Sequence, residues 1–118
     1  MMKTLFYLES CSTCQRIMKN LAIPESVRLR EIKSEPLTEN ELHALYERSG
    51  SYEALLSKRA RLYQERDLKN QSLDENDYKK LLLEHYTFLK RPVLVWGDQI
   101  AIGNSKKTEA QAYQLIHG

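Results

Sequence analysis

Residues 3–16, which read KTLFYLESCSTCQR, decide the fold that this chain can form. Residues 3–8 form a largely apolar run that is rich in β-favouring side chains and includes an aromatic pair, which is typical of a buried strand. Small polar residues of the kind that start helices follow at 10–13. The stretch therefore predicts a buried strand that runs directly into a helix, with Cys11 and Cys14 at the junction.

The residues after this junction continue the alternation of helix and strand patterns. Apolar side chains recur at helical spacing from Cys14 until Pro24, where the proline ends the segment. An alternating run at 27–32 predicts a second strand and completes a β-α-β unit. Because such a unit joins parallel strands, we expect the two cysteines at the carboxyl end of the first strand.

The later segments add helices, a hairpin and a final helix. Thr38-x-x-Glu41 has the pattern of a capping box, and Gly50 suits the left-handed conformation that ends a helix. The further elements that we expect are a helix opening at Thr38, helical segments at 52–56 and 72–85, strands at 93–96 and 99–102, and a helix after 103–105. This order predicts an α/β, thioredoxin-like fold in a single domain over residues 1–118, with a helical insertion at about 38–88.

Composition sets the class of protein. The chain has 118 residues, of which 42% are hydrophobic and 29% charged, and this is ordinary for one globular domain. Its formal net charge of +2 is too small to indicate a nucleic-acid-binding protein, so we expect no direct nucleic-acid contact. No apolar run approaches the length of a membrane span, and no signal peptide is recognisable. We expect a soluble, cytoplasmic protein with no membrane association.

The two cysteines have a spacing that suits thiol chemistry. A disulfide across two intervening residues closes almost no loop, so it would contribute little conformational stability. A reactive cysteine needs a lowered pKa, and the free N–H groups and positive dipole of a helix N-terminus provide it for Cys11. Cys14 lies one helical turn later, where it can attack a mixed disulfide on Cys11. The spacing predicts that Cys11 attacks and Cys14 resolves.

Three other readings of the pair remain open at this point. The cysteines could form half of a zinc site, but there is no second cysteine pair and the histidines at 43, 85 and 117 are scattered, so we expect no metal. They could be unreactive core residues, although their neighbours are polar. Cys11 could also act alone, with an external thiol such as glutathione as the resolving group.

Residues 6–16, FYLESCSTCQR, resemble the N-terminal motif of the ArsC/Spx family. That family contains glutaredoxin-linked arsenate reductases and the redox-sensing transcription regulator Spx. Further stretches resemble the family in the same order along the chain, and they are residues 34–38, 57–63, 89–95 and 101–103. The resemblance covers nearly the whole chain and implies a thioredoxin-like fold with an inserted helical subdomain.

The resemblance also implies roles for residues beyond the cysteines. It implies a cis peptide bond before Pro92, whose backbone would face the dithiol and dock an extended thiol substrate. It implies that Arg91 lies at the active site, where a guanidinium binds oxyanions and favours a nearby thiolate. Arg59 matches a mid-chain arginine of the Spx-like branch, and we expect it to bind substrate too. Lys58 and Arg61 are expected at the surface.

Two functions follow from the resemblance. The first is a thiol-dependent oxidoreductase that needs no bound cofactor and is reduced by glutathione with glutaredoxin, or by thioredoxin. The arsenate reductases place three arginines around the cysteine; Arg91 matches one of them, Ser57 stands near the place of another, and residues 103–106 contain none. The second function is a Spx-like redox-sensing regulator that binds the RNA polymerase α subunit.

Overall fold

The computed structural model describes residues 1–118, and its main elements follow the expected order. The elements are β1 (Lys3–Tyr7), α1 (Ser12–Leu21), β2 (Arg28–Glu31), α2 (Glu39–Ser49), α3 (Arg61–Glu65), α4 (Glu75–Glu84), β3 (Val93–Trp96), β4 (Gln99–Ile102) and α5 (Lys106–His117), with short 3₁₀ turns at η1 (Glu53–Leu55), η2 (Leu68–Asn70) and η3 (Tyr86–Phe88). The chain divides into two compact units, residues 1–35 with 91–118 and residues 36–90. This division into compact units does not test the expectation of a single domain with a helical insertion at about 38–88, which stays a prediction.

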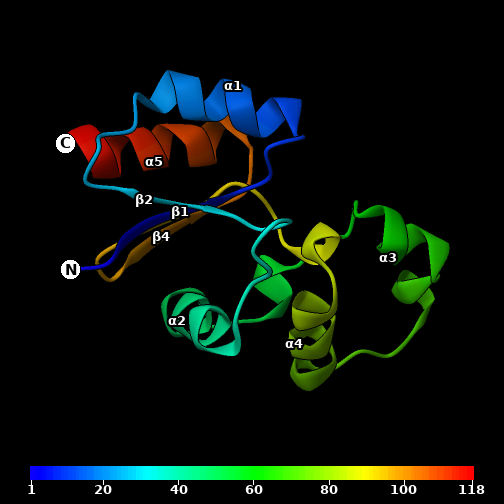
Figure 1. The fold of residues 1–118 in the computed structure, drawn as a ribbon. Helices are drawn as coiled ribbons and strands as arrows, with labels where there is room; N and C mark the ends of the chain where they lie inside the picture. The colour runs from blue at the N-terminus through cyan, green and yellow to red at the C-terminus, as the bar shows by residue number, and fades with distance from the viewer. The chain divides into compact units, whose positions relative to one another are not determined.

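The first unit is a four-stranded sheet covered on one face by two helices. The strand order is β2-β1-β3-β4; β1 pairs with β2 in parallel, and the β1–β3 and β3–β4 pairs are antiparallel. Figure 1 shows α1 and α5 side by side over the same face of this sheet, and the two helices contact each other. The β-α-β half and the β-β-α half therefore share one sheet, as the element order predicts.

The core of this unit lies between the sheet and the two helices. Leu5 on β1 pairs with Leu94 on β3, which in turn pairs with Ala101 on β4, so the three side chains form a row across the sheet. This row packs with Ile17 and Leu21 of α1, and all five residues are at most 2% exposed. Each fully buried leucine or isoleucine contributes roughly 1.5–3 kcal/mol relative to an exposed one. This packing fixes α1 against the end of β1.

The second unit is helical, and its longest helix begins as the sequence predicts. The Thr38 hydroxyl accepts from the Glu41 N–H at 3.1 Å, while the Glu41 carboxylate accepts from the Thr38 N–H at 3.0 Å, which confirms the capping box. Gly50 ends α2 with φ of 75°, the left-handed conformation expected of it. Asp74 and Asp77 form the same reciprocal pattern at the start of α4.

The sequence expectations differ from the structure in a few places. The helix α3 was not expected, because five residues make little more than one turn and show no hydrophobic period. The expected helical segment at 52–56 is only the 3₁₀ turn η1. The strand expected at 3–8 ends at Tyr7, and the one expected at 27–32 covers only β2. Short elements and element ends depend on tertiary contacts that a local pattern does not contain.

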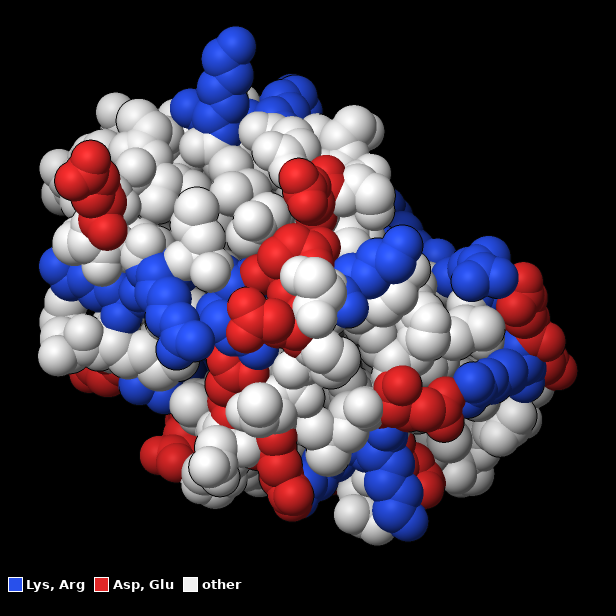
Figure 2. All heavy atoms as spheres, in the orientation of Figure 1, with Lys and Arg blue, Asp and Glu red and all other residues white.

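The surface of the molecule carries both signs of charge. Figure 2 shows lysine and arginine side chains interspersed with aspartate and glutamate over the visible face. Among the helices of the chain, none has the length and apolarity that a membrane span requires.

Candidate active site

Cys11 occupies the junction between β1 and α1. It is the N-cap residue of α1, with extended φ and ψ of −89° and 109°. Its N–H donates to the Leu8 carbonyl at 3.1 Å, and its carbonyl accepts from the Gln15 N–H at 3.1 Å. The N–H groups of the first helical turn have no partner within the helix, so they face the Cys11 side chain with partial positive charge.

The environment of Cys11 lowers its pKa below the ordinary value. Partial burial acts in the opposite direction and raises it. Hydrogen bonding from the backbone N–H and the thiol of Cys14, together with the charge and a hydrogen bond of Arg91, outweighs burial. The thiolate is therefore the form that this site stabilises.

Cys14 has the opposite properties. Its side chain is fully buried, and burial raises its pKa to about 11, although an N–H of Leu8 and the charge of Arg91 lower it and the neighbouring Cys11 raises it further. Both cysteines are free thiols. At neutral pH Cys14 is therefore a protonated, buried thiol, and it lies next to the partly exposed Cys11, whose pKa is lowered. A thiol with a lowered pKa and some exposure is the more reactive of the two, and the order of attack stays a prediction.

A cis peptide bond precedes Pro92, which confirms the expectation drawn from the family resemblance. Pro92 is buried, and its carbonyl accepts from the Gly103 N–H at 2.9 Å, so the bond is held at the entry to β3. The preceding residue, Arg91, directs its side chain to Cys11, with which it forms a hydrogen bond. The structure thus brings Cys11, Cys14, Arg91 and Pro92 together in one unit.

Arg59 lies in the other unit, between η1 and α3, and its side chain is exposed. Its expected role in substrate binding stays a prediction. The neighbouring basic residues are at the surface as expected. Lys58 pairs with Glu53 at 2.7 Å and Arg61 pairs with Glu65 at 3.4 Å, and all four side chains are exposed.

Sequence reasoning missed two residues that hold the loop before Cys11. The Glu31 carboxylate, at the end of β2, accepts from the Glu9 N–H at 3.0 Å. The Gln15 side chain donates to the Glu9 carbonyl at 3.1 Å. No sequence signal marks either residue, because both bonds depend on where β2 and α1 lie relative to the loop. Side chains that could ligate a metal form no group of three or more.

The two cysteines are expected to react with iodoacetamide in different pH ranges. In the reduced, folded protein one cysteine should alkylate with a midpoint below that of an ordinary thiol, because the pKa of Cys11 is lowered. Cys14 should alkylate only when the protein is unfolded, because it is buried and its pKa is about 11. Mass spectrometry of peptides alkylated across a pH series measures both. Alkylation of Cys14 in the folded protein at neutral pH would contradict the assignment.

Comparisons with known proteins identify relatives of this chain and solved structures of similar fold. The model of the ArsC family matches residues 6–112. The global transcriptional regulator Spx 1 of Bacillus cereus is 26% identical over 106 residues, which cover 86% of this chain and 79% of the regulator. A crystal structure of a putative ArsC family related protein from Bacteroides fragilis superposes with a TM-score of 0.78 at 24% identity, covering 95% of this chain and 99% of that one. An arsenate reductase from Vibrio cholerae superposes with a TM-score of 0.73 at 18% identity, covering 98% and 99%.

Proposed function

This chain belongs to the ArsC family, and from that premise we propose that it is a thiol-dependent oxidoreductase with Cys11 as nucleophile and Cys14 as resolving thiol. The observation that carries the proposal is the contrast between the two sulfurs. Cys11 lies at a helix N-terminus beside Arg91 with a lowered pKa, whereas Cys14 is buried with a pKa of about 11. A lone structural cysteine pair has no need of such a contrast.

The proposed reaction transfers two electrons from the protein to an oxidised substrate. With a disulfide substrate, the Cys11 thiolate attacks one sulfur, forms a mixed disulfide and releases the other sulfur as a thiolate. Cys14 then loses its proton and attacks the Cys11 sulfur, which forms the Cys11–Cys14 disulfide and releases the second thiolate. An external thiol, from glutathione with glutaredoxin or from thioredoxin, returns two electrons and restores the dithiol.

Arsenate fits the same sequence of steps. The Cys11 thiolate bonds to arsenic and displaces a hydroxyl of arsenate, which takes a proton from solvent and leaves as water. Cys14 then attacks the Cys11 sulfur, and the sulfur–arsenic bond breaks with its electron pair on arsenic, which leaves as arsenite. Arg91 would bind the oxyanion in this reaction: it forms a hydrogen bond with Cys11, and a guanidinium can donate to two oxygens at once. We propose arsenate as a substrate together with disulfides, and the contribution of Arg59 to the anion site belongs to this proposal.

The test is a trapping experiment with the resolving thiol removed. Reduced Cys14→Ser protein is incubated with oxidised glutathione and then examined by mass spectrometry. We expect one stable glutathione adduct on Cys11, because nothing remains to resolve it. The wild-type protein under the same conditions should carry the internal disulfide and no adduct. An adduct of equal yield and lifetime on the wild-type protein would show that Cys14 does not resolve.

A second assay distinguishes substrates. Arsenate is supplied with glutathione and glutaredoxin, or with thioredoxin and its reductase, and reductant consumption is followed. Turnover that depends on arsenate supports the oxyanion reaction. Turnover with disulfides alone restricts the function to thiol–disulfide exchange.

The similarity to Spx 1 favours one alternative, a redox-sensing regulator that binds RNA polymerase. In that case the Cys11–Cys14 disulfide would be the signal rather than a catalytic intermediate. A pull-down with the RNA polymerase α subunit, using reduced and oxidised protein, tests this directly. Binding that changes with oxidation, in a protein without turnover, would favour the regulator.

A further inference from the structure

We propose that Glu31 is a positioning residue for the Cys11 thiolate, acting through the hydrogen bond that it accepts from the loop between β1 and α1. The inference rests on the proposed function, since it concerns the same nucleophile. Glu31 touches neither cysteine in any contact that the structure provides. Its effect would pass through the backbone that places Cys11 at the helix N-terminus.

The loop before Cys11 is short, and its two residues nearest to Cys11 lie at the surface. Only Leu8, Glu9 and Ser10 separate β1 from Cys11, and Glu9 and Ser10 are exposed. The Glu9 peptide is tied on both sides, because its N–H donates to Glu31 and its carbonyl accepts from Gln15. Glu31 lies at the end of β2, whereas Gln15 lies on α1, the helix that Cys11 begins. Of the two bonds, only the one to Glu31 therefore fixes the loop relative to a strand of the sheet.

Glu31 is itself held in one place by the turn that follows β2. One oxygen of its carboxylate accepts from the Lys33 N–H at 3.0 Å, the Ser34 N–H at 2.7 Å and the Ser34 hydroxyl at 2.9 Å. The other oxygen accepts from Glu9. Together these donors lower the pKa of Glu31 to about 2 in spite of the opposing effect of burial. A carboxylate with four donors is locked in orientation and has little freedom to release the loop.

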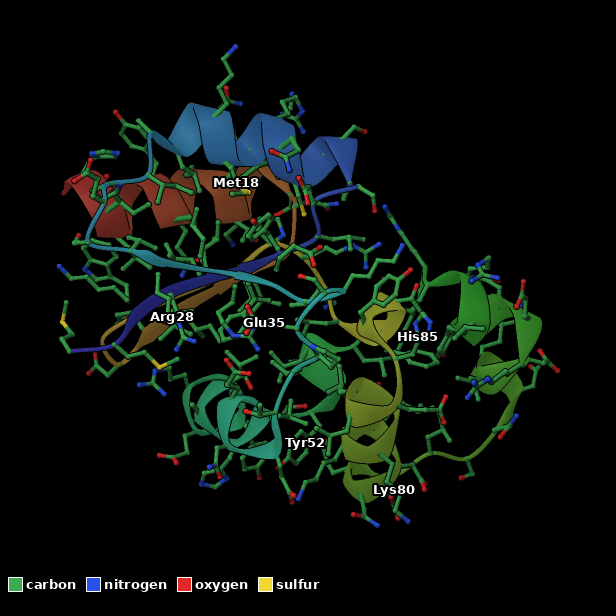
Figure 3. The ribbon with its side chains drawn as sticks, in the orientation of Figure 1. Met18, Arg28, Glu35, Tyr52, Lys80 and His85 are labelled. Carbon is green, nitrogen blue, oxygen red and sulfur yellow. The ribbon has the colours of Figure 1, made fainter.

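The turn after β2 is also held by hydrogen bonds to Glu35. The Glu35 N–H donates to the Glu31 carbonyl at 3.2 Å, and the guanidinium of Arg30 donates to the Glu35 carbonyl at 3.1 Å. Arg30 is only 3% exposed, and it pairs with the Glu35 carboxylate at 3.8 Å. Figure 3 labels Glu35 in the segment that leaves β2. The buried Arg30 thus holds the turn through Glu35, and the N–H groups of the turn hold the Glu31 carboxylate. Glu31 in turn holds the loop that ends at Cys11.

A positioning role and a purely electrostatic role of Glu31 predict opposite changes in the pKa of Cys11 when Glu31 is replaced. Removing a negative charge near a thiol favours the thiolate, so charge alone would lower the pKa of Cys11. Loosening the loop moves Cys11 away from the Cys14 N–H and from Arg91, the groups that lower its pKa, and so would raise it. The sign of the change separates a positioning role from a purely electrostatic one.

The experiment measures the pH profile of Cys11 alkylation by iodoacetamide in Glu31→Gln protein. Glutamine keeps the shape of the side chain but presents an N–H₂ group to one of the two sets of donors, so one set of hydrogen bonds is lost. We expect the midpoint to move to higher pH, and the rate at a pH below the wild-type midpoint to fall about threefold, following the smaller thiolate fraction. Gln15→Ala, which removes the second tether at an exposed helical site where alanine is favourable, should shift the midpoint in the same direction.

Glu75→Gln is the matched control. The Glu75 carboxylate accepts from the N–H groups of Tyr52 and Glu53 at 2.7 Å and 3.1 Å, so it has the same chemistry, but it belongs to the other unit. Its replacement should lower stability in urea while leaving the Cys11 midpoint unchanged. A midpoint that stays or falls in Glu31→Gln overturns the proposal, as does an equal rise in the Glu75→Gln control. If Glu31→Gln does not fold, Glu31→Asp takes its place, because the shorter side chain keeps the charge but draws the carboxylate back from the Glu9 N–H, and an unchanged midpoint in that variant overturns the proposal.

The outcome is independent of the substrate. The alkylation profile needs no turnover, so a failed arsenate or disulfide assay leaves the test of Glu31 intact. A wild-type midpoint at the value of an ordinary thiol would instead contradict the nucleophile assignment on which both proposals depend.

Discussion

Cys11→Ser is expected to lose turnover with arsenate and with disulfide substrates by at least about a thousandfold, the scale of loss when an enzyme loses its nucleophile. A hydroxyl does not ionise near neutral pH, so the helix N-terminus and Arg91 would have no anion to stabilise. Cys14 does not replace it, because that thiol is buried and has a pKa of about 11. The measurement is reductant consumption in the coupled assay, with thermal unfolding of the same sample.

The stability of this variant separates chemistry from folding. Serine is among the best N-cap residues, so α1 should be at least as stable as in the wild-type protein. An unchanged or higher unfolding temperature together with lost turnover is the expected pair of results. Turnover within tenfold of wild type would show that Cys11 is not the nucleophile.

Arg91→Gln is expected to raise the pKa of Cys11 and to weaken the binding of any oxyanion substrate. The guanidinium contributes both its charge and a hydrogen bond to the lowered pKa of this thiol. Because a neighbouring positive charge favours the ionised form of a thiol, the alkylation midpoint should move to higher pH and the thiolate fraction below it should fall. The pH profile of alkylation measures this change without reference to a substrate.

Arg91→Lys is the matched variant. Lysine keeps the positive charge but cannot fork onto two oxygens. The alkylation midpoint should therefore remain closer to wild type than in Arg91→Gln, while the KM for arsenate should rise in both variants. If the lysine and glutamine variants shift the midpoint equally, the hydrogen bond rather than the charge of Arg91 controls the thiol. If neither shifts it, Arg91 has no part in activating Cys11.

Much of the fold could be predicted because its signals are local. The capping box at Thr38 and Glu41 and the left-handed Gly50 are set by residues within a few positions of one another. The two segments that flank Gly97 have a clear β pattern, and they form the strands β3 and β4. The helix α3 was missed for the opposite reason, since a five-residue helix is stabilised by its surroundings and not by its own period.

The residues of the site divide in the same way. The placement of Cys11 at a helix N-terminus follows from the sequence between residues 3 and 16, because a strand pattern there gives way directly to a helix pattern. The position of Arg91 beside it was expected only through the family resemblance. No spacing rule connects residues eighty positions apart; the antiparallel pairing of β1 with β3 brings them together.

The KTLFYLESCSTCQR stretch by itself determined that a dithiol would stand at the start of a helix, because strand propensity, helix capping and one-turn spacing are all local properties. Only the tertiary structure decided how the two sulfurs differ. Burial raises the pKa of Cys14 to about 11, whereas the hydrogen bonds of Cys14 and the charge and hydrogen bond of Arg91 lower the pKa of Cys11. The support of the loop by Glu31 also depends on β2 lying parallel to β1. The pKa of a cysteine depends on its burial and on nearby charges and hydrogen bonds, and some of the groups that provide them here come from distant parts of the chain. These effects therefore arise only when the chain has folded.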